Sequence, residues 1–235
     1  TNPEKNTVTG TINLTSSLTI SDDLTILGAG ADRITLDGSG IGTGNIINVT
    51  GSTLKTTTLK GMTIENAANG NGIYVYANNL VTEHLVINNN SSDGIDFSGD
   101  FYGNYGTLDV SHTTISNNDN GIVSYYHSGT TIGYSTITGN STTWYGAGVV
   151  LSNEYGASTI NYSTITGNTQ NNGGASGGGM YVMGGNTNVN HSVIAGNTAT
   201  NIGGISGAGV NLYSSIVANN TNGGANVQGG NNGGN

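Results

Sequence analysis

The sequence predicts an all-β fold, a parallel β-helix (β-solenoid) whose coils are about 22–29 residues long. Three observations predict it: an apolar motif recurs seven times, a glycine followed by alternating apolar residues recurs with it, and the composition disfavours helices. Of 235 residues, 41 are Gly and 36 are Asn, and glycine is a poor helix former. A repeat this short cannot bury its apolar face alone, so successive repeats must stack.

The first part of the chain, residues 1–58, is predicted to form an irregular N-terminal cap and the first coils. Apolar residues recur here less regularly than later in the chain, as Ile12, Leu18, Leu24, Ile34 and Val49 illustrate. A cap would cover the end of the stack, where unpaired strand edges would otherwise be exposed.

Regular coils of the same domain are predicted for residues 59–228. Their central apolar residues are Ile64, Ile87, Ile115, Ile137, Ile165, Ile194 and Val217, spaced by 23, 28, 22, 28, 29 and 23 residues. Three positions after each stands Asn, except at Ala67, which predicts an amide ladder along one turn. Five positions before each, except at Thr82, stands another apolar residue. We expect both series to be structural.

The second recurrent signature is a glycine that precedes a strand. It occurs at Gly72, Gly94, Gly121, Gly148, Gly179, Gly209 and Gly224. Alternation after Gly72 predicts that Ile73 and Val75 point inward while Tyr74 and Tyr76 point outward. We expect the glycines to adopt the left-handed turn conformation. Residues 229–235 lack either signature and are predicted to be a flexible tail.

Several segments resemble a known group of proteins. The segments Gly10-Thr-Ile-Asn-Leu-Thr and 24–38 resemble the start of bacterial right-handed parallel β-helix surface proteins. The units Ser-Thr-Ile-Thr-Gly-Asn and 177–182 look like repeats of the chlamydial-type polymorphic outer membrane proteins and their choice-of-anchor relatives. Over residues 10–228 the resemblance implies a right-handed helix, secretion and surface display, usually through a C-terminal anchor.

Charge and composition exclude several classes of function. The net charge is -9, all four Lys and Arg lie within the first 60 residues, and there is no Cys. Nucleic acid is therefore not an expected partner, because phosphates are bound mainly by Lys and Arg. No run approaches the roughly 18 apolar residues of a membrane-spanning helix.

An acidic cluster raises the alternative of a carbohydrate-active enzyme. It contains Asp93, Asp96 and Asp100, with Asp119 in the next repeat. Glycoside hydrolysis needs two carboxyl groups, one of raised pKa, and Asp96 with Asp100 or Asp119 are the candidates. Turn-forming or solvated carboxylates are the simpler interpretation. A weaker one is a calcium site at Asp93, Asp96 and Asp100, because calcium prefers clustered oxygen ligands; no other cofactor is indicated.

Aromatic residues gather in the longer connections of the middle coils. Flat rings with a polar edge suit sugars, and loops on a rigid scaffold often carry binding groups. Alternatively these rings only pack over their own loops. The candidate ligand-binding residues are Tyr102, Tyr105, Tyr125, Tyr126, Trp144 and Tyr145.

Two further sets of side chains recur at equivalent positions of successive repeats. His112 and His191 take the place that Tyr134 and Tyr162 take in other repeats, which predicts one exposed ladder and not a metal site. Thr rows at Thr136-Ile-Thr138 and 164–166 raise ice binding as a minor alternative, although Thr is also simply a good strand residue.

The leading functional interpretation is a non-catalytic, extracellular or cell-surface module that acts as a stalk, adhesin or filament subunit. Its partners would be glycans or surface proteins met by the aromatic loops, and open coil ends would permit head-to-tail self-association. Carboxylates gathered in one groove, with one raised pKa, would favour the enzyme; carboxylates on separate faces would exclude it.

Overall fold

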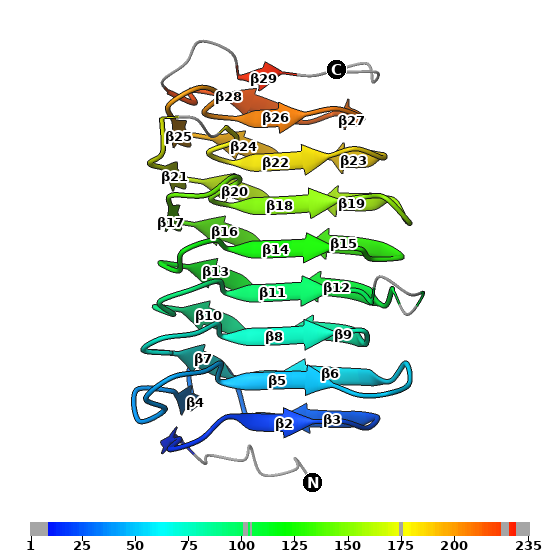
Figure 1. Cartoon of the computed structure of the whole chain (residues 1–235). Helices are drawn as coiled ribbons and strands as arrows, with labels where there is room; N and C mark the ends of the chain where they lie inside the picture. The colour runs from blue at the N-terminus through cyan, green and yellow to red at the C-terminus, as the bar shows by residue number, and fades with distance from the viewer. Residues whose placement is uncertain (1–8, 101–102, 104, 174–175, 222–225, 229–235) are drawn as a thin grey trace, which may run out of the picture.

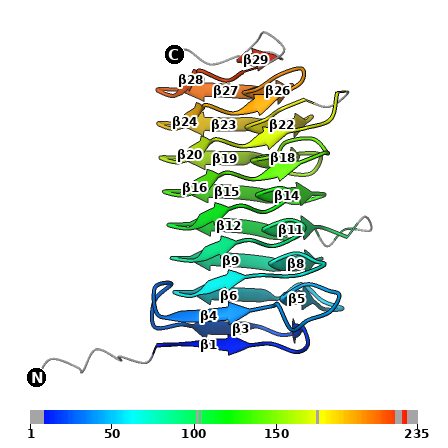
Figure 2. The same ribbon diagram turned by 90° about the vertical axis from the view of Figure 1, so that its left-hand side faces the viewer.

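The computed structural model describes residues 9–100, 103, 105–173, 176–221 and 226–228, and all its elements there are β-strands. Successive coils stack along one axis, with residues 10–13 at one end of the stack and residues 227–228 at the other (Figure 1; Figure 2). The parallel β-solenoid expected from the sequence is confirmed. No helix within these residues is long and apolar enough to cross a membrane.

Each described coil except the last contributes one strand to each of three long parallel sheets. Sheet A contains β1 (Gly10–Asn13), β4 (Ile34–Asp37), β7 (Thr63–Glu65), β10 (Val86–Asn88), β13 (Thr114–Ser116), β16 (Thr136–Thr138), β20 (Thr164–Thr166), β24 (Val193–Ala195) and β28 (Ile216–Ala218). Sheet B, whose strands cross the front of Figure 1, contains β2 (Leu18–Ile20), β5 (Ile47–Thr50), β8 (Ile73–Tyr76), β11 (Ile95–Ser98), β14 (Ile122–Tyr125), β18 (Val149–Ser152), β22 (Met180–Met183), β26 (Ile205–Gly207) and β29 (Val227–Gln228).

Sheet C and a short sheet D complete the coil. Sheet C contains β3 (Leu24–Leu27), β6 (Thr56–Lys60), β9 (Asn79–Glu83), β12 (Thr107–Ser111), β15 (Gly129–Gly133), β19 (Ser158–Asn161), β23 (Thr187–Asn190) and β27 (Val210–Tyr213). Sheet D contains β17 (Ser141–Thr142), β21 (Thr169–Gln170) and β25 (Thr198–Ala199), and it lies in the longer turns that lead from sheet A to sheet B.

The apolar anchors form a continuous column inside the solenoid. Ile87 pairs with Ile64 on one side and Ile115 on the other, and the column continues in register to Val217. The six isoleucines of this column are fully buried, so the register expected from the sequence is confirmed.

The predicted asparagine ladder runs along the turn after sheet A. Asn140 donates from Nδ2 to Asn168 Oδ1 at 2.9 Å, and it accepts from Asn118 at 3.1 Å. Equivalent bonds join the other members, which are Asn90, Asn118, Asn168, Asn197 and Asn220. Because each amide also accepts a backbone N–H from the preceding coil, the ladder satisfies polar groups that are buried in the turn.

The predicted conformation of the recurrent glycines is wrong for five of them. Gly72, Gly94, Gly121, Gly148 and Gly179 do not adopt positive φ. They are required by close packing: a Cβ on Gly121 would lie 2.5 Å from Gly148 O and 2.6 Å from Ile137 Cγ2. These glycines therefore let neighbouring coils approach beside the isoleucine and asparagine columns.

The last repeat also differs from the prediction. Gly209 has positive φ, but the strand that follows it, β27, pairs with β23 in sheet C. The equivalent of Gly179 is Gly204, which precedes β26 in sheet B. Gly224 and residues 229–235 lie outside the described residues.

An exposed ring ladder follows the turn from sheet C to sheet A. Rings of successive coils lie 4.8–5.1 Å apart, and their residues share positive φ of 48–53°. The members are His84, His112, Tyr134, Tyr162 and His191. The exposed ladder expected from the sequence is therefore confirmed, and it extends by one coil to His84.

Candidate functional site

A pocket of about 310 Å³ lies on the outer face of sheet B, beside the turns that arrive from sheet A. Three carboxyl groups and three aromatic rings lie in its wall. The lining residues are Ser92, Asp93, Asp96, Asp119, Asn120, Val123, Tyr125, Trp144, Tyr145 and Val150.

Asp96 is placed in the pocket by the alternation of β11. Ile95 and Phe97 are fully buried, so the side chain between them points outward, as the sequence predicts. Its neighbours in the adjacent coils are Tyr74 and Val123. Asn71 Nδ2 donates to Asp96 Oδ2 at 3.2 Å, and burial raises the pKa of Asp96 despite this bond.

Asp93 stands in the turn just before β11. Its backbone N–H donates to Asn71 Oδ1 at 2.9 Å, and its Oδ1 accepts the backbone N–H of Asn120 at 3.2 Å. Burial raises the pKa of Asp93 to about 7, and the negative charges of Asp96 and Asp119 add to the effect. Asp93 is thus the carboxyl group of the pocket that holds a proton close to neutral pH.

Asp119 reaches the pocket from the equivalent turn of the next coil. Its backbone N–H donates to Ser92 O at 2.9 Å, which ties the two turns together. Burial raises the pKa of Asp119, while a hydrogen bond from Thr142 lowers it. Thr142 is buried on β17 and its Oγ1 also accepts the backbone N–H of Trp144 at 3.0 Å.

The aromatic wall comes from β14 and from the turn after β17. Tyr125 is half-buried; burial, then the charges of Asp93 and Asp96, raise its pKa. The Tyr145 ring stacks on Tyr181 with centroids 4.6 Å apart, and Asn120 Nδ2 donates to the Tyr145 carbonyl at 2.8 Å. The Trp144 side chain is 70% exposed and is available to a ligand.

Residues 45–222 match the family described as "Right handed beta helix region". The chain belongs to this right-handed β-helix family. Among the curated proteins none matches. One similar solved structure is the crystal structure of pectate lyase Pel9A, at 14% identity and a TM-score of 0.43, covering 96% of this chain. The chain spans 64% of the length of that protein. None of these comparisons singles out a surface-protein group.

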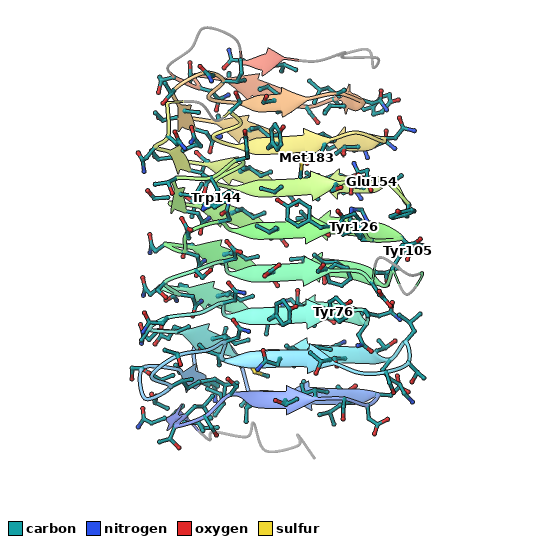
Figure 3. All side chains as sticks on the ribbon, viewed as in Figure 1. Tyr76, Tyr105, Tyr126, Trp144, Glu154 and Met183 are labelled. Carbon is teal, nitrogen blue, oxygen red and sulfur yellow. The ribbon has the colours of Figure 1, made fainter. Side chains whose placement is uncertain are left out.

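A second aromatic cluster of the β-helix lies at the opposite end of the sheet B strands, in the turns that lead to sheet C. Tyr105 stacks on Tyr155 at 4.0 Å, and the Tyr126 ring lies 6.3 Å from Tyr155. Figure 3 shows Trp144 on one side of the sheet and Tyr105 on the other. Tyr105 and Tyr145 thus each stack on a ring of another coil. Tyr102 lies outside the described residues.

Asp100 takes a different position from the three pocket carboxylates. It follows the far end of β11, and its Oδ1 accepts a hydrogen bond of 3.4 Å from the Tyr76 hydroxyl; it does not line the pocket. Among the residues that the structure describes, no group of three or more His, Asp, Glu or Cys is arranged to hold a metal ion. Asp93, Asp96 and Asp100, the candidate calcium ligands, are thus not brought together in this β-helix, because Asp100 lies apart from the other two.

Positive charge is remote from the pocket. Lys55 lies 3.4 Å from Asp22 Oδ1, and Lys60 forms an ion pair with Glu83. The chain has no Lys or Arg after Lys60, so none of the coils that form the pocket carries one.

Sequence reasoning missed the residues that position the carboxyl groups. These residues are Asn71, Asn120 and Thr142, and each acts across coils on a residue 22 or more positions away. One available signal was the shared position of Asn71, Asp93 and Asn120, each of which stands directly before a recurrent glycine.

Proposed function

We propose that this β-helix acts on carbohydrates and hydrolyses glycosidic bonds in the pocket over sheet B. One observation carries the proposal: three carboxyl groups gather beside aromatic rings, and only Asp93 has a pKa raised as far as about 7. Glycoside hydrolysis uses one carboxylic acid and one carboxylate, and such a difference in environment assigns the two roles.

Asp93 is the proposed general acid. Its proton passes to the glycosidic oxygen while the bond from that oxygen to the anomeric carbon breaks. Asp96 or Asp119, as carboxylate, takes a proton from the water whose oxygen bonds to the anomeric carbon. The products are two shorter glycans, one with a new reducing end; the base then releases its proton to solvent, and Asp93 recovers one from solvent.

Trp144, Tyr145 and Tyr125 are the proposed sugar-binding wall. Their rings offer flat apolar faces with polar edges next to the carboxyl groups, which suits the two faces of a pyranose. An extracellular or cell-surface location, where polysaccharides are met, fits this role and remains part of the proposal.

A second candidate is glycan adhesion without cleavage, as in a surface-displayed module. The observation that favours it is the 70% exposure of Trp144, since an exposed indole on a rigid turn can hold a sugar without any chemistry. The same residues would then define the contact surface, and the carboxyl groups would only accept hydrogen bonds from sugar hydroxyls.

The test is product analysis on a panel of soluble polysaccharides, with binding measured in parallel. We expect new reducing ends with the wild type and a loss of at least about 100-fold in rate for Asp93→Asn. Asp109→Asn, which changes the same charge on β12 of sheet C, is the matched control and should retain the wild-type rate. Binding without any new reducing end would overturn hydrolysis in favour of adhesion.

A further inference from the structure

We infer that the pocket over sheet B takes glycans that carry a free amine, of the 2-amino-2-deoxy sugar type, in preference to N-acetylated, neutral or uronic acid glycans. This inference rests on the proposed function, because it names the substrate class of the same pocket. Three properties of the pocket support it: its charge, its aromatic wall and its size.

The charge of the pocket must be compensated by the ligand. Asp93, Asp96 and Asp119 line one cavity, and the coils around it contain no Lys or Arg. The charges of Asp96 and Asp119 help to raise the pKa of Asp93 to about 7, so below that pH a proton on Asp93 relieves their mutual repulsion. An ammonium group would relieve it in the same way, whereas the carboxylate of a uronic acid would add to it.

The aromatic wall favours the same ligand. A cation beside the face of Trp or Tyr is attracted by the ring quadrupole, and Trp is the strongest of these rings. Trp144 is exposed beside the pocket, while Tyr145 is held in place by its stack on Tyr181. An amino sugar satisfies both requirements, because it brings a flat ring face and a positive charge in one unit.

The size of the cavity favours a sugar over a protein segment. About 310 Å³ is at the small end of ligand pockets, which usually hold about 300–1,000 Å³. Asn71, Asn120 and Thr142 hydrogen-bond to the carboxyl groups, so a sugar unit entering the pocket would meet groups that are already held in place.

The test compares four probes on the wild-type protein by calorimetry at pH 5.5: the glucosamine hexamer, the N-acetylglucosamine hexamer, the galacturonate hexamer and hexalysine. We expect the glucosamine hexamer to bind at least about tenfold more tightly than the acetylated hexamer, which is a difference of about 1.4 kcal/mol. The preference should shrink as salt rises, because salt screens charges. The galacturonate hexamer should not bind.

Two variants separate charge from stacking. Asp96→Asn should reduce the preference for the amine by about fivefold or more, while Asp109→Asn on sheet C should leave it unchanged. Trp144→Ala should weaken both sugar hexamers through lost stacking, and the glucosamine hexamer somewhat more, because it also loses the attraction between its ammonium group and the indole. Binding of hexalysine as tight as that of the glucosamine hexamer, unaffected by Trp144→Ala, would overturn the inference by reducing it to general attraction to an acidic surface.

The outcomes for cleavage and for preference are distinct. Preferential binding of the glucosamine hexamer without any new reducing end would sustain this inference and refute hydrolysis. Cleavage of acetylated or neutral glycans with equal or tighter binding than the amine form would sustain hydrolysis and overturn this inference.

Discussion

Thr142 Oγ1 accepts the backbone N–H of Trp144 at 3.0 Å, and the same hydroxyl hydrogen-bonds to the Asp119 carboxylate. One buried side chain on β17 thus bonds to both the backbone of Trp144 and a carboxyl group of the pocket. The hydroxyl can do this because it accepts one hydrogen bond and donates another. The long turn around Trp144 is therefore tied to the carboxyl group of Asp119.

Thr142→Val should disturb the pocket while keeping the volume of the side chain. Loss of the hydrogen bond that lowers the pKa of Asp119 should raise that pKa further, and the rate of glycan cleavage should fall by about tenfold or more at pH 6. Steady-state kinetics against pH checks this. Thr143→Val, an exposed neighbour, is the control, and equal effects of the two variants would contradict the role of Thr142.

Asn140→Ala should destabilise the solenoid through the asparagine ladder. Asn140 is fully buried and bonds to Asn118 and Asn168, so truncation leaves buried polar groups unpaired at a cost of about 1–3 kcal/mol each. The free energy of unfolding in urea should fall by roughly 2–4 kcal/mol. Asn201→Ala, at an exposed position, should change it by no more than about 0.5 kcal/mol; a similar small change for Asn140→Ala would show that the ladder is dispensable.

Gly121→Ala should be poorly tolerated although the φ of Gly121 is ordinary. The new Cβ would meet the Gly148 carbonyl oxygen at 2.5 Å, and backbone of a neighbouring coil cannot move aside without disrupting its own ladder. We expect a loss of about 2–4 kcal/mol in the free energy of unfolding. Gly133→Ala meets nothing within 4 Å and should be close to neutral in the same urea titration. If both substitutions prove neutral, close packing is not the reason for glycine.

The pH dependence of stability should separate Asp93 from His127. The pKa of Asp93 is about 7 in the folded protein against an ordinary 3.8, so the native state holds a proton that the unfolded chain has released. Its contribution therefore makes the free energy of unfolding fall as pH rises through this window.

Burial of His127 has the opposite effect. It lowers the folded pKa to about 4 from 6.5, only partly offset by Asn153, and the ring is fully buried. The unfolded chain alone is protonated between these values, so this contribution to stability is lost as pH falls toward 4.

Asp93→Asn should leave the effect of His127 on the pH dependence of stability without the opposing effect of Asp93. Without Asp93, the free energy of unfolding should rise more steeply between pH 4.5 and 6.5 than in the wild type. Above pH 7 the variant should be the more stable by a few kcal/mol at most, since a tenfold difference in proton affinity between the two states corresponds to about 1.4 kcal/mol. Urea unfolding at pH 4.5, 6.5 and 8 measures both effects. Identical slopes for the two proteins would refute the raised pKa of Asp93.

Much of the fold could be predicted because its repeats act through columns. The spacing of the isoleucines fixed which residues pair, and three positions later each asparagine had to meet its equivalent in the next coil. The glycines show where this reasoning fails. A recurrent glycine can be required by a positive φ or by close packing, and the sequence around Gly121 does not distinguish the two. In the last coil Leu212 fits two columns at once, and only the pairing with Val189 decides between them.

The site was less predictable, because it depends on turns of unequal length. Asp96 could be placed on the outer face from the alternation of β11, but nothing in the sequence indicated that Asp93 and Asp119 lie in tied turns on the same side. Asp100 seemed equivalent and is not, since a strand's length separates it from Asp93. Trp144 and Tyr145 are candidate binding residues from the sequence, yet their position beside the carboxyl groups depends on hydrogen bonds with Thr142 and Asn120 that the repeat pattern does not predict.

The most direct test of glycan hydrolysis at this pocket is the pH dependence of reducing-end formation from the glucosamine hexamer and the polysaccharide panel, in the wild type and in Asp93→Asn. We predict cleavage of at least one glycan by the wild type, declining above an apparent pKa of about 7 as Asp93 loses its proton, and almost none by the variant. Cleavage that persists unchanged in Asp93→Asn, or no cleavage of any glycan at any pH, would contradict glycan hydrolysis by Asp93.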